Sequence, residues 1–228
     1  MSKPWTIAID GPAGAGKSTV ARLLARRLGY LYVDTGAMYR VVALHALRQR
    51  SQDLSDDEIS ALARAVRIEF VAVPGEEAQR ILLNGEDVTE AIRTPEVAER
   101  SSVVSAIPGV RSALVALQQA MGASGGVVME GRDIGTVVMP TAQVKVFLTA
   151  SPEERAARRH ADLLARGNSV NLEDVRAEQD ARDHRDATRT VAPLVPAPDA
   201  VLLKSDDLPP ELVVDEIMEI IDDRRRDA

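Results

Sequence analysis

The chain has 228 residues, of which 45% are hydrophobic and 28% charged, and this composition is typical of a globular protein rather than a disordered one. Its net charge of −7 provides no general positive field for nucleic acid or an anionic membrane, so we expect a local cluster to bind any anionic ligand, which favours a small phosphate compound. The absence of cysteine excludes disulfides and thiolate chemistry, and no apolar run approaches the roughly 18 residues of a membrane span.

Apolar periodicity together with Gly and Pro signals predicts alternating strands and helices, the pattern of a parallel α/β fold. In chain order the predicted elements are a strand at 6–10, a helix at 18–28, a strand at 31–33, helices at 38–47, 55–66, 95–104 and 108–121, strands at 126–129 and 144–149, helices from 152 and at 172–189, a strand at 201–203 and a helix at 210–221. Ser55 and Glu58 form a capping box. Gly167-Asn168 ends the helix that begins at Pro152, and we expect the tail 222–228 to be disordered.

The segment 67–88 departs from the α/β pattern. Its apolar residues alternate over 68–73, Pro74-Gly75 predicts a turn, and Asn84-Gly85 is a strong hairpin signal. We therefore predict a small antiparallel sheet inserted into the α/β chain.

A phosphate-binding loop is the strongest motif in the sequence. It matches G-x-x-x-x-G-K-[ST] and lies between a predicted strand and a predicted helix, which is the context that the motif requires. Its residues are Gly11, Pro12, Ala13, Gly14, Ala15, Gly16, Lys17 and Ser18. We expect backbone N–H groups and Lys17 to bind the phosphates of ATP and Ser18 to ligate Mg²⁺. Asp34 either assists Mg²⁺ through water or caps the helix that follows it.

The remaining motifs favour a kinase over a molecular switch. A guanine-binding switch needs Asn-Lys-x-Asp, and the sequence contains no Asn-Lys pair. A kinase for a small acceptor instead needs a second anion site, and arginines occur in four stretches: 34–40, 129–136, 151–167 and 182–189. Arg132 and Asp133 directly follow a predicted strand, where α/β sheets bind ligands. For the two helical stretches, a solvated charged face is the alternative.

Four segments, IDGPAGAGKSTVA, YVDTGAMYR, EGRDIGTVV and RDHRDATRTVAPL, resemble in order and spacing the bacterial-type cytidylate kinases, over nearly the whole chain. The resemblance implies an adenylate-kinase-like P-loop fold, with a five-stranded parallel sheet flanked by helices, an NMP-binding lobe with an antiparallel insert at about 67–88, and a helical lid. The boundaries that it implies are a core at 1–35, 113–154 and 176–228, the NMP-binding lobe at 36–112 and the lid at 155–175.

The same resemblance implies roles for individual residues. Ser102, Arg111 and Asp133 would bind the cytosine base, where a carboxylate can accept a hydrogen bond from the exocyclic amine. Thr35, Arg182 and Asp186 would lie around the sugar, and Arg40, Arg132 and Arg189 around the phosphate. Tyr39 would add to the substrate site, and Thr19 and Arg158 to the ATP site. Of these residues and the loop, Lys17, Arg132, Arg182 and Arg189 would be catalytic.

The expected function is transfer of the γ-phosphoryl group of ATP to CMP or dCMP, with Mg²⁺ as cofactor. The arginines at 182–189 would then face CMP, and we expect residues 176–189 to be more mobile without nucleotide. We expect a monomeric cytoplasmic enzyme that binds neither nucleic acid nor membranes. Two alternatives stay open from the residues alone: a P-loop kinase for another acceptor, and an ATP-binding regulatory module that consumes little ATP.

Overall fold

The structure is a computed structural model that describes residues 4–49, 54–73, 79–165, 167–189 and 191–227. The chain divides into two compact units, one formed by Met1–Tyr32 and Ser124–Ala228 and the other by Val33–Ala123. The predicted turn at Pro74-Gly75 and the arginine at position 166 lie outside the described residues.

The first unit is built on a five-stranded sheet with the strand order β2-β6-β1-β7-β8. The strands of this sheet are β1 (Thr6–Asp10), β2 (Leu31–Asp34, which contains the boundary between the units), β6 (Val127–Gly131), β7 (Val144–Thr149) and β8 (Val201–Lys204). Its helices are α1 (Lys17–Leu28), α6 (Pro152–Ala165), α7 (Leu172–Thr188) and α8 (Pro210–Arg226), with a π-helical turn at Ile134–Val138. These elements confirm the predicted P-loop α/β class.

The register of the sheet brings three loops to one edge. β1 pairs in parallel with β6 and with β7, and Asp10 lies opposite Gly131 on one side and Phe147 on the other. Because parallel strands that are in register end together, the segments that follow β1, β6 and β7 leave the sheet side by side. This edge therefore gathers the glycine-rich loop, Arg132 with Asp133, and the start of α6.

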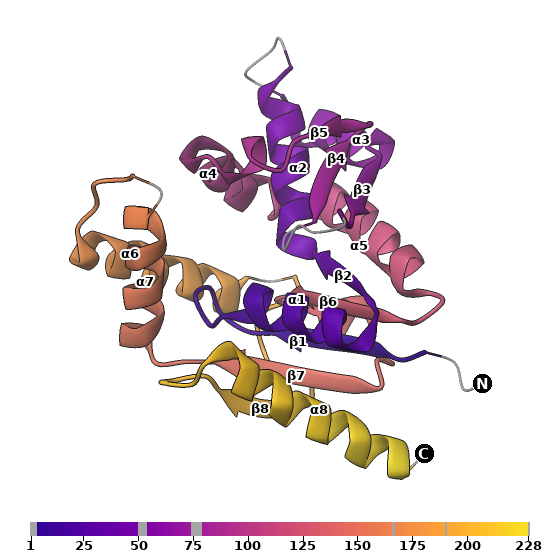
Figure 1. The fold of residues 1–228 in the computed structure, drawn as a ribbon. Coiled ribbons are helices and arrows are strands. Elements are labelled where there is room, and N and C mark those ends of the chain that lie inside the picture. The colour runs from indigo at the N-terminus through magenta and orange to yellow at the C-terminus, as the bar shows by residue number, and fades with distance from the viewer. Residues whose placement is uncertain (1–3, 50–53, 74–78, 166, 190, 228) are drawn as a thin grey trace. The chain divides into compact units, whose positions relative to one another are not determined.

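The core of this unit explains why the central strands lack apolar and polar alternation. All five residues of β1 and all five of β6 are buried, as in a parallel sheet that is covered on both faces. α1 and α8 pack on the sheet beside each other (Figure 1), and Leu24 and Ile217 contribute to a core that also contains Ile7, Ile9 and Val146.

The second unit contains the small antiparallel sheet. Its strands are β3 (Ile68–Val71), β4 (Arg80–Leu83) and β5 (Glu86–Asp87), and its helices are α2 (Thr35–Leu47), α3 (Asp56–Ala65), α4 (Pro95–Val104) and α5 (Pro108–Gly122), with a 3-10 turn at Ala91–Arg93. Leu83 pairs with Glu86 across Asn84 and Gly85, whose φ values are 51° and 89°. Positive φ at both positions is the geometry of a two-residue hairpin turn, so the predicted hairpin is confirmed. The capping box of Ser55 and Glu58 is also present.

One prediction about a helix was wrong, and one helical turn was missed. Disorder was expected from residue 222, but α8 continues to Arg226. Arg224 donates hydrogen bonds to the carbonyl oxygens of Gln143 and Asp199, and the guanidinium of Arg225 lies 5.4 Å from the centre of the Trp5 ring. These long-range contacts stabilise the last turn of α8, a charged segment whose helical structure cannot be predicted from apolar periodicity. The π-helical turn at 134–138 was not predicted.

None of the helices in the described ranges combines the length and the apolar character that crossing a lipid bilayer requires.

Candidate active site

The glycine-rich loop lies between β1 and α1 and has backbone geometry that requires glycine. Gly11 has a φ of 147°, and a Cβ atom there would lie 1.9 Å from the carbonyl oxygen of Leu148. Gly14 has a φ of 78°, and its Cβ would lie 2.7 Å from Nε2 of Gln179. α1 begins directly after the loop, so the positive end of its dipole adds to the backbone N–H groups at the start of the helix. The loop is thus shaped to bind phosphate.

Lys17 is buried at the end of the loop, with 5% of its surface exposed. Its Nζ donates a hydrogen bond to the carbonyl oxygen of Pro12 at 2.7 Å. The pKa of Lys17 is lowered from 10.5 to about 7, mainly by burial and also by the cations of Arg132 and Arg182, while two nearby carboxylates oppose the shift. Three cations that share this environment form a site for a strongly anionic ligand, whose binding would raise the pKa of Lys17 again.

Asp10 connects the loop to the residues that follow β6. Its carboxylate accepts hydrogen bonds from the N–H groups of Ile134 at 2.8 Å and Gly135 at 2.7 Å. Burial raises the pKa of Asp10 to about 6, although these two N–H groups lower it, while the neighbouring charge of Asp133 raises it. The last residue before the glycine-rich loop therefore fixes the turn that carries Asp133.

Arg132 and Asp133 each face a residue at the C-terminal end of α7. Arg132 Nε lies 2.9 Å from a carboxylate oxygen of Asp186, and Arg189 Nη2 lies 3.8 Å from Oδ1 of Asp133. Together with the charge of Arg182 at Lys17, these contacts bring six predicted site residues of the first unit together. They are Lys17, Arg132, Asp133, Arg182, Asp186 and Arg189.

α6 carries two arginines that contact protein groups near the loop. Arg158 donates to Glu154 at 2.8 Å and to Ser205 Oγ at 3.0 Å. Arg155, which the sequence did not single out from its neighbours, is buried and donates to the carbonyl oxygen of Ala13 at 3.1 Å. Ser205 also donates to the carbonyl oxygen of Ala15 at 3.1 Å. Several side chains thus hold the loop from outside.

The second unit contains the other predicted substrate residues. Asp34 caps α2 by accepting a hydrogen bond from the N–H of Ala37 at 2.8 Å, and it pairs with Arg40, also at 2.8 Å. Of the two roles considered for Asp34, the structure shows the cap. The guanidinium of Arg111 lies 6.0 Å from the centre of the Tyr39 ring. Thr35 is buried at the start of α2, and Ser102 is exposed on α4.

The side chains around the loop fit a magnesium ion that arrives with nucleotide phosphates. In the described part of the chain, no group of three or more His, Cys, Asp or Glu residues could hold a metal ion. Ser18, however, is exposed in the first turn of α1, directly after Lys17. Mg²⁺ is commonly held by few protein ligands together with substrate phosphates and water, so Ser18 and a bound triphosphate are a suitable set.

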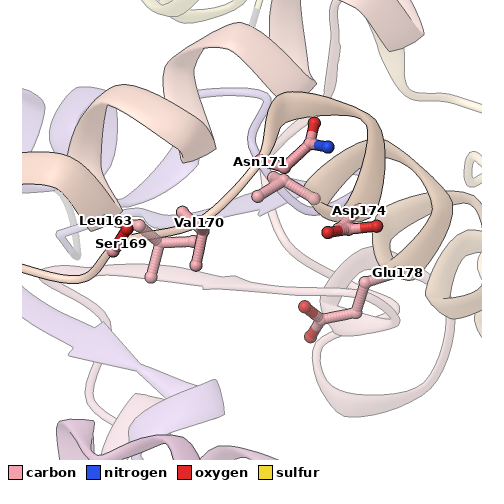
Figure 2. Close-up of a pocket in the computed structure, with 7 residues that line it drawn as sticks. Leu163, Ser169, Val170, Asn171, Asp174 and Glu178 are labelled. Carbon is pink, nitrogen blue, oxygen red and sulfur yellow. The ribbon is translucent and has the colours of Figure 1, made fainter.

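A hollow of about 490 Å³ between α6 and α7 lies outside this group of residues (Figure 2). Its lining includes the carboxylates of Asp174 and Glu178, with Leu163, Val170 and Val175 beside them. Among the described residues that line the hollow there is no basic side chain, so it does not suit a nucleotide phosphate.

The loop after β1, the parallel sheet behind it and the cations at the sheet edge define a P-loop protein of the kinase fold. A solved structure of shikimate kinase from Bacteroides thetaiotaomicron has this fold: it matches with a TM-score of 0.51 and 14% sequence identity, over 96% of this chain and 98% of that one. More particularly, the chain belongs to the cytidylate kinase family, whose sequence profile matches residues 7–223.

Curated relatives agree with this assignment. A cytidylate kinase of Desulfitobacterium hafniense (strain Y51) is 50% identical over 224 residues, which cover 98% of this chain and 95% of the relative. A cytidylate kinase of Pelotomaculum thermopropionicum is 53% identical over 221 residues, which cover 97% of both chains. The family expected from the sequence motifs is therefore confirmed.

Proposed function

We propose that this protein transfers the γ-phosphoryl group of ATP to CMP and dCMP, giving ADP and CDP or dCDP. The observation that carries the proposal is that the charges of Arg132 and Arg182 act on Lys17 of the glycine-rich loop, with Arg189 paired to the neighbouring Asp133, in a chain of the cytidylate kinase family. A binding module for ATP alone does not need this many cations beyond its loop. Phosphoryl transfer does, because negative charge spreads over three equatorial oxygens in the transition state.

On the donor side, the loop N–H groups from Gly11 to Thr19 hold the ATP phosphates, and Lys17 reaches the β- and γ-phosphates. Arg158, on α6, is assigned to the ATP site. Mg²⁺ held by Ser18 and the phosphates would neutralise charge on the transferring group. The burial of Lys17 strengthens its interaction with that group, because charges interact more strongly away from bulk water.

On the acceptor side, Asp133 accepts a hydrogen bond from the exocyclic amine of cytosine, and Ser102 and Arg111 complete the base site. Thr35, Arg182 and Asp186 bind the sugar, while Arg40, Arg132 and Arg189 bind the phosphate, with Tyr39 beside them. Uracil would present an acceptor to the carboxylate of Asp133, which explains a preference for CMP. The acceptor phosphate is already ionised near neutral pH, so no catalytic base is required.

The lobe boundaries stay part of the proposal. Residues 36–112 are assigned as the NMP-binding lobe and 155–175 as a lid that excludes water during transfer, with the rest forming the core. The enzyme is proposed to act in the cytoplasm as a monomer, without nucleic-acid or membrane partners.

A coupled ADP-release assay tests the proposal with ATP and Mg²⁺ against CMP, dCMP, UMP, AMP and GMP, and with an acceptor-free control. The expected result is rapid turnover with CMP and dCMP, slow turnover with UMP and negligible turnover with the purine nucleotides. If turnover is fastest with another of these nucleotides, that nucleotide is the acceptor and the assignment to CMP is wrong. If ATP binds but no acceptor accelerates ADP release, the protein is a regulatory ATP-binding module and not a kinase.

A further inference from the structure

The carbonyl oxygen of Ala13, in the middle of the glycine-rich loop, accepts hydrogen bonds from two helices. Arg155 on α6 donates from Nη1 at 3.1 Å, and Gln179 on α7 donates from Nε2 at 2.7 Å. Both side chains are buried, with exposed fractions of 6% for Arg155 and 7% for Gln179. A backbone carbonyl oxygen has two lone pairs, so the two buried donors fill its hydrogen-bonding capacity and fix its direction.

Asp183 completes this group. Its carboxylate forms an ion pair with the same Nη1 atom of Arg155, while Nε of Arg155 donates to the carbonyl oxygen of Ala150 at 3.1 Å. Asp183 lies one helical turn after Gln179, so both face α6, which packs against α7 (Figure 1). We refer to Arg155, Gln179 and Asp183 as the Ala13 clamp.

The clamp controls the direction of an N–H group in the loop. A peptide unit is planar and trans, so when the Ala13 carbonyl is held toward α6 and α7, the N–H of Gly14 must point to the opposite side. The amide of Gln179 also packs directly on Gly14, because a Cβ atom there would lie only 2.7 Å from Gln179 Nε2. A donor that is fixed before the ligand arrives binds phosphate without the cost of reorganisation.

Within the part of the chain that the structure describes, two oxygen atoms of the clamp lack a hydrogen-bond partner, although a contact that served only stability would be expected to satisfy them. Gln179 Oε1 and Asp183 Oδ1 are buried and have no hydrogen-bond partner among the described residues. Unsatisfied buried oxygens lower stability, so this arrangement is not the one that stabilises the fold most. Functional sites are where such costs are retained.

We propose that Gln179, supported by Arg155 and Asp183, is a positioning residue that orients the Ala13–Gly14 peptide for the donor phosphates. α7 also carries Arg182 and Asp186, and Arg189 directly follows it, so the helix proposed to bind the acceptor fixes the donor loop as well. The inference rests on the proposed function, since it assumes that ATP binds in this loop.

Gln179→Met tests the inference, because methionine has a similar size but cannot donate to Ala13. The expected result is a KM for ATP that rises by about fivefold, corresponding to the loss of one oriented hydrogen bond, while the KM for CMP changes by less than about twofold. The melting temperature should stay the same or rise, since the unsatisfied Oε1 atom is removed. Glu178→Met is the matched control: it replaces the exposed neighbour on the same helix and should leave both KM values unchanged.

Asp183→Asn provides a second, independent variant, because it keeps the shape of the side chain and removes the charge that holds Arg155. It should also raise the KM for ATP selectively, and combination with Gln179→Met should give less than the product of the two effects. Direct titration with a non-hydrolysable ATP analogue should show the same loss of affinity in both variants.

Three outcomes would overturn the inference: wild-type KM for ATP in Gln179→Met, equal changes in both KM values, or a lower kcat with a lower melting temperature and both KM values unchanged. The last result would indicate a merely structural role. Failure of the proposed function gives a different pattern, in which the wild-type protein shows no CMP-dependent turnover. The analogue titration then still decides whether the clamp supports binding in the loop.

Discussion

Arg132 Nε lies 2.9 Å from a carboxylate oxygen of Asp186, so the end of β6 and the last turns of α7 are joined by an ion pair. A second pair joins the same two segments: Arg189, at the end of α7, lies 3.8 Å from Asp133, which follows β6. In this pair the arginine belongs to the helix side and the carboxylate to the strand side. Arg132 and Arg189, both proposed to bind phosphate, are thus each balanced by a carboxylate proposed to bind another part of CMP. The acceptor would rearrange these pairs when it binds.

Asp186→Asn should weaken acceptor binding. The variant removes the charged partner of Arg132 and a strong acceptor for a sugar hydroxyl, so we expect the KM for CMP to rise by about tenfold, with a smaller change in the KM for ATP. Steady-state kinetics with each substrate varied in turn provide the measurement. Asp180→Asn, at an exposed position of the same helix, is the control. An unchanged KM for CMP would contradict the sugar assignment.

Asp133→Ala should reduce the preference for CMP over UMP. The carboxylate is proposed to pair with the exocyclic amine of cytosine and to disfavour O4 of uracil, so its removal should lower the ratio of kcat/KM values by at least about tenfold. The ratio is measured with both acceptors at saturating ATP. If the ratio stays at its wild-type value, a group other than Asp133 binds the exocyclic amine.

Lys17→Met should lower kcat by about 10²–10³-fold, because the transferring phosphoryl group loses a buried cation. The affinity for CMP, measured by direct titration, should change little. A variant that retains wild-type turnover would show that this loop does not hold the reacting phosphates.

The same substitution should change how stability depends on pH. The pKa of Lys17 is lowered from 10.5 to about 7 in the folded protein, so between these values the unfolded chain binds the proton and the folded chain does not. The free energy of unfolding due to Lys17 therefore rises as the pH increases through this window. Without nucleotide, Lys17→Met should be more stable than the wild type at about pH 6, and the advantage should shrink at about pH 9. Urea unfolding of both proteins at the two pH values measures it, and a pH-independent difference would contradict the burial of a charged Lys17.

Gly109→Ala should destabilise the second unit. A Cβ atom at this position of α5 would lie 2.3 Å from Oγ and 2.7 Å from Cβ of Ser60 on α3, which packs against α5. We expect a loss of about 1–3 kcal/mol in the free energy of unfolding. The double variant Ser60→Gly with Gly109→Ala should recover part of the loss, because it removes the serine side chain with which the new Cβ atom clashes. If the double variant is no more stable than Gly109→Ala alone, the cause lies elsewhere.

The features predictable from the sequence are those that depend on neighbouring residues. The hairpin at Asn84-Gly85 follows from two residues that tolerate positive φ, and the glycine-rich loop follows from a motif between a strand and a helix. The alternation of strands and helices along the chain likewise allows the α/β sheet to be predicted, because each element is recognised from its own residues.

The features that were missed depend on contacts between distant parts of the chain. The role of Asp10 appears only when its carboxylate meets Ile134 and Gly135, more than 120 positions away. Gln179 gave no signal at all, since a lone polar residue on a charged helix predicts an exposed side chain. The helical end of α8 likewise depends on Arg224 reaching Gln143. The roles of the proposed substrate residues stay predictions.

α7 is attached to the protein mainly through polar groups. Of its 17 residues only Val175 and Gln179 are buried, whereas α8, of the same length, buries Val213, Val214, Ile217 and Ile221. An element with so little apolar contact can open at a small free-energy cost while the core stays folded. The opening of α7 is then governed by its polar side chains, whereas the melting temperature is governed by the apolar side chains of the core. Charge substitutions along α7 should thus change how readily this helix opens without weakening the sheet.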